Sequence, residues 1–327
     1  ARAARPVARR LALAILVAGG LAVGGAAAQT YPSRPIRFLI PFAPGGVGDL
    51  TSRVVAQKMS ENLGQQIVID NRPGAGMIVT ADVALKADAD GYTLVLMGNG
   101  TAISASLFKS LPYDALRDFA HVSTISFFDL VLLTNPASKF QTVGDVLAYA
   151  KANPGKLDLG TVSMGSTQSL AAELFKSMAG IDAQTVPYKA TPALMNAVRA
   201  NDVPLAFEIL GGVMSQIRSK ALRPIAVTTE KRSSLLPEVP TIAESGVPGY
   251  SANSWNGISV RSGTPRPIID RLAREVAVAL AAPEVQKRMH DLGVEPRAMS
   301  PEDTRALFAA DIVKWRAVIE RARIERQ

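Results

Sequence analysis

IRFLIPFAPGGVGD, residues 36–49, predicts a strand, a glycine-rich turn and a helix start in direct succession. Ile36 to Ile40 is short and apolar, which is typical of a buried strand. The apolar residues that follow recur at helical spacing: Leu50, Val54, Val55, Met59 and Leu63. Asp49 is placed to cap that helix. The stretch therefore predicts one complete βα unit with a turn at its centre.

The turn between this strand and helix is suited to hold an anion. Its glycines let the backbone approach a ligand closely, and a helix start presents unpaired N–H groups and the positive end of the helix dipole. A nucleotide site is disfavoured, because the turn lacks the lysine of G-x-x-x-x-G-K-[ST] and its glycines do not match G-x-G-x-x-G. A tight βα turn with no ligand stays open as the alternative.

The first 28 residues have the pattern of a secretory signal peptide. An arginine-bearing segment without acids is followed by the apolar run Leu11 to Gly25 and by Ala26-Ala27-Ala28. We expect cleavage after Ala28 and export to the periplasm. A permanent anchor is disfavoured because the run is short for a bilayer, and no later stretch is long and apolar enough to cross a membrane. Without the four leader arginines the net charge falls from +8 to +4.

Composition excludes several classes of function. The chain has no cysteine, so disulfides and thiolate metal sites are ruled out. The modest positive charge without a basic run argues against nucleic acid. The two histidines, His121 and His290, are not expected to converge, and no dense cluster of Asp, Glu and His suggests a metal. We therefore expect no cofactor, no metal site, no catalytic residues and no enzymatic activity.

Strand and helix signals alternate along the chain, which is typical of α/β proteins with parallel sheets. Two similar α/β blocks are predicted, the second inserted in the first: lobe 1 from 29–126 and 229–327, and lobe 2 from 127–228. Residues 229–254 are expected to be a connection. The predicted strands lie at 36–40, 66–70, 93–97, 121–125, 130–134, 157–162, 184–188, 203–208, 224–228 and 255–260, and helices include 143–152, 167–178 and 213–219.

Several strings taken together resemble the Bug family, the extracytoplasmic solute receptors of tripartite tricarboxylate transporters. The matching strings are YPSRPIRFLIPFAPGGVGD, NRPGAG, ADGYTLVL, LPYDALRDF, MGSTQSLAAELF, VPYKATPAL, LRPIAVTTEKRSSLLPEVPTIAESGVPGY and WNGISVRSGTPRPII. They run in the family's order over nearly the whole mature chain. The resemblance implies a type II periplasmic binding protein, in which two hinged lobes, each with a mostly parallel sheet flanked by helices, trap one carboxylated solute. It also implies membrane permease subunits as partners and a monomer.

Four turns are predicted to reach the cleft, because ligands in open parallel sheets bind at the carboxyl ends of the strands. We expect their backbone N–H groups and hydroxyls to hold one carboxylate in lobe 1 while lobe 2 closes over the remainder. The candidate ligand-binding residues are Phe42, Pro44, Gly45, Gly46, Gly48, Asp49, Asn99, Thr101, Ser163, Gly165, Ser166, Thr167, Tyr188, Lys189 and Thr191. Phe42 and Trp255 are also candidates to contact an apolar part of the solute.

The sequence departs from the family pattern at three places. Ser169 stands where the G-S-x-x-H string has histidine, and Ala190 stands where Y-K-G has glycine. Glu208, a further candidate ligand-binding residue, ends a predicted strand of lobe 2. It is either an acceptor or counter-charge for the far end of the solute, or a residue of a hinge or inter-lobe salt bridge.

These features together predict a periplasmic receptor that captures a small mono- or dicarboxylate, aliphatic or aromatic, for a tripartite tricarboxylate-type transporter. Two alternatives stay open. The protein could pass its ligand-bound state to a membrane sensor kinase, or it could be an enzyme on the same scaffold.

Overall fold

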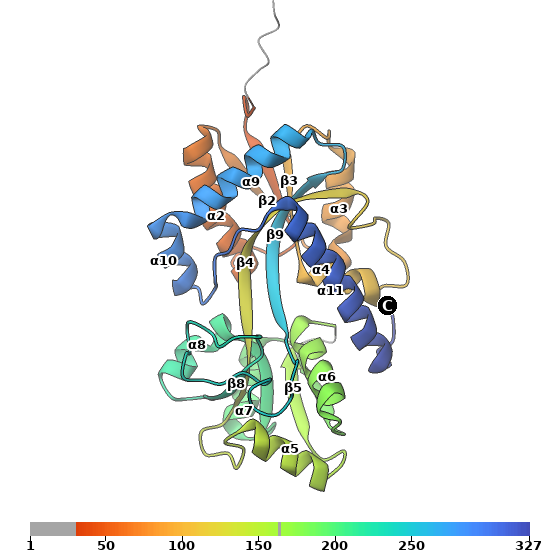
Figure 1. Ribbon diagram of the computed structural model, residues 1–327, viewed down its shortest axis with the longest axis vertical. Helices are drawn as coiled ribbons and strands as arrows, with labels where there is room; N and C mark the ends of the chain where they lie inside the picture. Colours follow the sequence, from red (N-terminus) through yellow and green to blue (C-terminus); the bar gives the residue numbers. More distant parts are fainter. Residues whose placement is uncertain (1–30, 163–164) are drawn as a thin grey trace, which may run out of the picture. The chain divides into compact units, whose positions relative to one another are not determined.

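Two long strands, β4 (Phe119–Thr134) and β9 (Asn253–Arg261), run antiparallel to each other along the middle of the sheet (Figure 1). The computed structural model describes residues 31–162 and 165–327, and Arg34–Gln327 form one unit of it. The predicted signal peptide, 1–28, lies outside the described residues. No described helix combines the length and apolar character needed to span a membrane.

The outer strands of the sheet pair in parallel within two lobes. In lobe 1, β1 (Ile36–Ile40) lies between β2 (Ile67–Asn71) and β3 (Thr93–Gly98). In lobe 2, β5 (Asp158–Val162) lies between β6 (Gln184–Tyr188) and β7 (Leu205–Ile209). β8 (Arg223–Val227) pairs with β4. These lobes confirm the predicted two-lobed α/β class.

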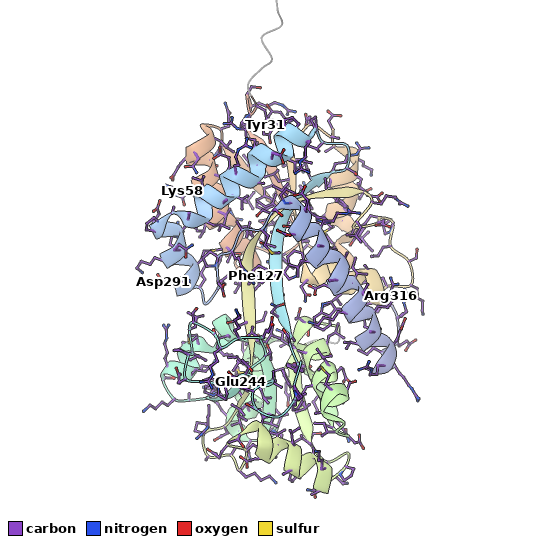
Figure 2. The ribbon with its side chains drawn as sticks, viewed as in Figure 1. Tyr31, Lys58, Phe127, Glu244, Asp291 and Arg316 are labelled. Atoms are coloured by element: carbon purple, nitrogen blue, oxygen red, sulfur yellow. The ribbon has the colours of Figure 1, made fainter. Side chains whose placement is uncertain are left out.

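The sheet is nevertheless mixed, and β4 and β9 are the reason. β9 pairs antiparallel with β3 and β4, and β4 pairs antiparallel with β7 and β8. β4 is one strand where two were predicted, because residues 127–129 also pair with β9. β4 pairs with β9 up to Asp129 and with β7 from Leu130 onward, and Phe127, labelled in Figure 2, lies near this change of partner. A strand that leaves one lobe and another that returns to it must run in opposite directions.

Helices cover both lobes. Around lobe 1 lie α2 (Val47–Leu63), α3 (Ile78–Lys86), α4 (Asn99–Leu107), α9 (Arg266–Ala281), α10 (Pro283–Asp291) and α11 (Pro301–Arg321), with a short 3₁₀ turn, η1 (Ala75–Met77). Around lobe 2 lie α5 (Val143–Ala152), α6 (Thr167–Ala179), α7 (Thr191–Ala200) and α8 (Leu210–Arg218). Leu194, Val198 and Leu210 fill a core of lobe 2 with Val131 of β4.

The last helix, α11, reaches both lobes. It packs along α4 and also contacts α6, and Arg321 Nη1 donates to Ser177 Oγ at 2.8 Å. Trp315 of α11 is fully buried, and Phe308 lies edge-on to Trp255 of β9 with ring centroids 5.5 Å apart. The core thus continues from the strands of lobe 1 into the region where the lobes meet.

Candidate functional site

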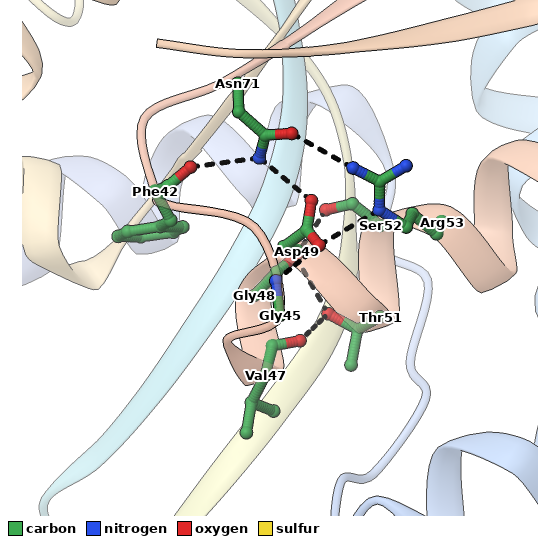
Figure 3. A network of polar contacts seen from close by, with 9 residues as sticks. All are labelled: Phe42, Gly45, Val47, Gly48, Asp49, Thr51, Ser52, Arg53 and Asn71. Carbon is green, nitrogen blue, oxygen red and sulfur yellow. Dashed lines mark hydrogen bonds and ion pairs between the residues drawn. The ribbon is translucent and has the colours of Figure 1, made fainter. Parts of the chain in front are cut away.

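The glycine turn and the start of α2 are held by a buried carboxylate (Figure 3). Asp49 Oδ2 accepts from the Gly45 N–H at 2.9 Å and from Arg53 Nε at 2.9 Å, and Oδ1 accepts from Asn71 Nδ2 at 2.9 Å. Asp49 was predicted to cap the helix, but Gly46 is the N-cap residue and Asp49 is the third residue of the helix. From that position its side chain accepts from the N–H of Gly45, the residue before the N-cap, and so connects the turn to the first turn of the helix.

The pKa of Asp49 follows from these contacts. Burial opposes ionisation of this carboxyl, but the hydrogen bonds from Arg53, the Gly45 amide and Asn71 outweigh it, so the pKa lies below its ordinary value of 3.8. Asp49 is thus a charged group whose oxygens already have partners on the protein. It positions the turn and leaves little capacity for a solute.

The backbone N–H groups at the start of α2 have no partner among the described residues at Val47, Gly48 and Asp49, as is normal for a first helical turn. The ring of Phe42, 42% exposed, lies against Gly48, where a methyl group would be 2.8 Å from Phe42 Cδ2. Pro44, Gly45 and Gly46 are exposed at the tip of the turn. The turn therefore presents N–H groups beside an aromatic face.

The start of α4 is built by close approach of two backbones. Gly98, its N-cap residue, leaves no room for a side chain, because a methyl group there would be 2.1 Å from the Trp255 carbonyl of β9. Thr101 Oγ1 accepts from the Gly98 N–H at 3.4 Å and donates to Met77 Sδ at 3.7 Å. Thr101 therefore supports this helix start from within.

Asn99 joins the start of α4 to the start of α6 in the other lobe. Its Nδ2 donates to Thr167 Oγ1 at 2.8 Å, and its Oδ1 accepts from Trp315 Nε1 at 2.6 Å. Gly165, with a φ of +76°, packs against Leu107 of α4, since a methyl group there would be 2.5 Å from Leu107 Cδ2. Asn99 and Thr167 were predicted to bind a solute. In this structure their side chains bond to each other, and both residues are buried.

Glu208 joins the helix starts of lobe 2. Its Oε1 accepts from Gln168 Nε2 at 2.8 Å and from the Ile209 N–H at 2.8 Å, and its Oε2 accepts from Thr191 Oγ1 at 2.9 Å. Gln168 opens α6 and Thr191 opens α7. Ser166 caps α6 by accepting from the Ser169 N–H at 3.1 Å.

Glu208 has no cation partner among the described residues, so the inter-lobe salt bridge offered as one role for it is not formed. The side chain is 2% exposed. Burial raises the pKa of Glu208 above its ordinary value of 4.5, against the lowering effect of the hydrogen bonds from Gln168, Ile209 and Thr191. Its carboxylate therefore accepts three hydrogen bonds from neutral groups but has no ion-pair partner among the described residues.

The remaining predicted residues lie at the edge of this arrangement. Tyr188 ends the edge strand β6 and is half-buried, and Lys189 is exposed beside it. Ser163 lies outside the described residues. His121 is buried in β4, where its ring stacks on Phe308 and burial lowers its pKa to about 4. His290 is exposed at the end of α10, so the two histidines do not converge.

Three of the four predicted turns are thus linked in series, and the turn before α2 is held separately by Asp49. Side-chain contacts connect α4 to α6 through Asn99 and Thr167, and α6 to α7 through Glu208. Sequence reasoning missed Gln168 and Trp315, which bond within this series, Asn71, which bonds to the α2 turn, and Asn256, which lies beside Gly48 and Gly98. Only Gln168 gave a usable signal, because it is the second residue of a predicted helix start. The others come from segments far away in the sequence.

Two further features of the molecule bear on where a site lies. A cavity of about 660 Å³ lies near the joint of β4 and β9, lined by Asp129, Arg232, His290 and Arg297 among others. None of the predicted site residues lines it. Among the described residues, no group of three or more His, Asp and Glu side chains is placed to hold a metal.

The chain resembles proteins of known kind along most of its length. Residues 51–324 match the family profile described as "Tripartite tricarboxylate transporter family receptor". Protein BugT of Bordetella pertussis is 37% identical over 298 residues, 89% of this chain and 90% of BugT. The solved structure of R. palustris Rpa4515 with adipate has a TM-score of 0.76 at 33% identity, covering 89% of this chain and 98% of that one. MatC (Rpa3494) from Rhodopseudomonas palustris with bound malate has a TM-score of 0.72 at 27% identity, covering 88% and 100%.

Proposed function

Because the chain belongs to the family of tripartite tricarboxylate transporter receptors, we propose that it captures a small carboxylate between its lobes and delivers it to the permease subunits of such a transporter. The solute is a mono- or dicarboxylate, aliphatic or aromatic. Two solved relatives carry adipate and malate, which supports a carboxylate here. The protein binds this solute and does not convert it.

The observation that carries the proposal is the pair of free helix starts in lobe 1. The α2 and α4 starts offer backbone N–H groups. The carboxylate in the first turn of α2, Asp49, is paired with Arg53. A charge-assisted hydrogen bond contributes about 1.5–3 kcal/mol, and micromolar affinity needs about 8 kcal/mol. Four or five such bonds therefore suffice after the costs of binding.

The two lobes have unequal parts in this proposal. In lobe 2 the carboxylate of Glu208 accepts hydrogen bonds from side chains at the starts of α6 and α7, and its negative charge weakens their attraction for an anion. The carboxylate therefore binds to lobe 1, and lobe 2 closes over the rest of the solute. We propose that lobe 1 comprises 29–126 and 229–327, that lobe 2 comprises 127–228, and that β4 and β9 form the hinge.

A thermal-shift screen tests the carboxylate. Succinate, adipate, malate and benzoate are each compared with the matching neutral amide. An acid present at a hundred times its dissociation constant adds about 2.7 kcal/mol to the stability of the folded state. We expect at least one acid to raise the melting temperature while its amide does not. Equal shifts with acid and amide, or no shift with any acid, would contradict the proposal.

Three further measurements test lobe closure, the absence of chemical conversion and cleavage of the signal peptide. Small-angle scattering is expected to show a smaller radius of gyration with the acid than without it, as closure requires. Chromatography of the acid after long incubation is expected to recover it unchanged. Mass spectrometry of the exported protein is expected to find Gln29 at its N-terminus, which would place cleavage after Ala28. A conversion product would favour the enzyme alternative.

A further inference from the structure

Asn256 of β9 lies between the two free helix starts of lobe 1. In the sheet it is opposite Gly98, the N-cap residue of α4. A methyl group at Gly98 would be 2.8 Å from Asn256 Oδ1, and a methyl group at Gly48 of α2 would be 3.2 Å from Asn256 Nδ2. Both glycines therefore leave room for this one amide, which lies within reach of both helix starts.

The side chain of Asn256 is largely buried, and its amide has no hydrogen-bond partner among the described residues. Its side chain is 8% exposed and makes no hydrogen bond with any residue that the structure describes. Buried polar side chains are nearly always hydrogen-bonded, and an exception calls for an explanation. Its neighbours are different: Asn99 and Asn71 use both their oxygen and their nitrogen within the protein.

The unpartnered amide faces a pocket. A cavity of about 140 Å³ is lined by Asn256 together with Phe42, Met77, Met97, Gly100 and Thr101, among others. The walls are mainly apolar, and the Thr101 hydroxyl is already engaged with Gly98 and Met77. Asn256 is therefore the side-chain amide in this pocket that is free to recognise a polar group.

We propose that Asn256 is a solute-binding residue that determines specificity: its Nδ2 donates to an oxygen of the solute carboxylate, while the pocket beside it takes a short apolar part of the same solute. This inference rests on the proposed function. The charge on the solute is then shared between the N–H groups of the helix starts and one side-chain donor. The small volume of the pocket favours an unbranched segment next to the carboxylate.

Asn256→Asp tests the donor, because it keeps the shape of the side chain and replaces the N–H donor by a negative charge. With the acids of the panel, we expect calorimetry to show at least about a 10-fold loss of affinity, since the loss of one charge-assisted hydrogen bond has that effect. Asn201→Asp, at the exposed end of α7, makes the same change in net charge away from the pocket and is expected to keep affinity within about 2-fold.

Asn256→Ala separates a solute role from a structural one. Without solute, we expect the melting temperature of this variant to equal or exceed that of the wild type, because the lost amide has no partner on the protein. A clear fall would show that the amide supports the fold and would overturn the inference. Unchanged affinity in Asn256→Asp would overturn it too, while leaving the proposed function intact. If the wild type binds no acid, the proposed function and the role of Asn256 are both contradicted.

Discussion

A buried carboxylate lies at a helix start in each lobe, and the two are held in opposite ways. Asp49 in lobe 1 is paired with a cation, Arg53, whereas Glu208 in lobe 2 accepts only from neutral groups. The pKa of Asp49 lies below its ordinary value and the pKa of Glu208 above it. In the proposed function, this difference makes the helix starts of lobe 1 more attractive to an anion than those of lobe 2.

The largest effect is expected from Asp49→Asn. The change removes the acceptor of Arg53 and leaves the Gly45 N–H without a charged partner, so the free energy of unfolding should fall by about 2–4 kcal/mol at neutral pH. Urea unfolding measures this. Asp82→Asn is the matched control, because Asp82 is paired with Lys86 on an exposed helix face and should cost under about 0.5 kcal/mol. Equal costs in the two variants would show that Asp49 does not hold the turn.

Glu208→Gln should cost less, about 1 kcal/mol near neutral pH, because the charge that it removes is disfavoured by burial. The two variants should also differ in their dependence on pH. The folded state raises the pKa of Glu208, so the stability that Glu208 contributes is present below pH 4.5 and is lost as the pH rises through its folded pKa. The folded state lowers the pKa of Asp49, so its contribution is present above pH 3.8 and is lost as the pH falls.

Unfolding of both variants from pH 3 to pH 7 measures these slopes. The deficit of Asp49→Asn should grow with pH, and the deficit of Glu208→Gln should shrink. Parallel slopes would remove the contrast between the lobes.

Arg53→Met removes the cation from Asp49, so that Asp49, like Glu208, accepts hydrogen bonds only from neutral groups. We expect a loss of about 1 kcal/mol, because Arg53 is 45% exposed and is well solvated without its partner. The more informative result is the pKa of Asp49, which should rise in a carboxyl NMR titration. Lys86→Met removes the cation from the exposed pair with Asp82 and should leave the Asp49 titration unchanged. An unchanged Asp49 pKa in Arg53→Met would mean that the cation does not distinguish the lobes.

Thr191→Val has the smallest expected effect, about 0.5–1 kcal/mol, since it removes one of three donors to Glu208. It should raise the pKa of Glu208 further. Thr191→Ser keeps the hydroxyl and should restore the wild-type titration. If valine and serine behave alike, the hydroxyl is not a partner of Glu208 in solution.

Short strands and helices could be predicted from the sequence, because the spacing of apolar residues and the turn residues at their ends are local features. The strands at 36–40 and 184–188 and the helix at 143–152 have the predicted bounds. The joint between the lobes was not predictable in the same way. Residues 126–129 show neither the alternation of apolar and polar side chains that indicates a strand nor the cluster of turn residues that ends one. Only their pairing with β9, more than a hundred residues later, shows that β4 continues through them.

The site was predictable only as a set of turns. Glycine turns and helix starts have local signatures, so these segments could be identified from the sequence. Which side chains face a solute depends on partners from other segments: Thr167 is 68 positions from Asn99, and Trp315 is 216 positions from it. The spacing of Asp49 and Arg53, four residues apart on a helix, was the one local sign that Asp49 turns inward.

The bond from Trp315 to Asn99 makes the region where the lobes meet directly observable. The chain contains two tryptophans. The Trp315 indole donates to the residue that joins the two lobes, and the backbone carbonyl of Trp255 lies against the N-cap glycine beside the pocket. Any rearrangement of those helix starts therefore alters the surroundings of an indole. The intrinsic fluorescence of the unlabelled protein should change in wavelength or intensity when the lobes move, so solute capture can be followed in real time without an attached dye.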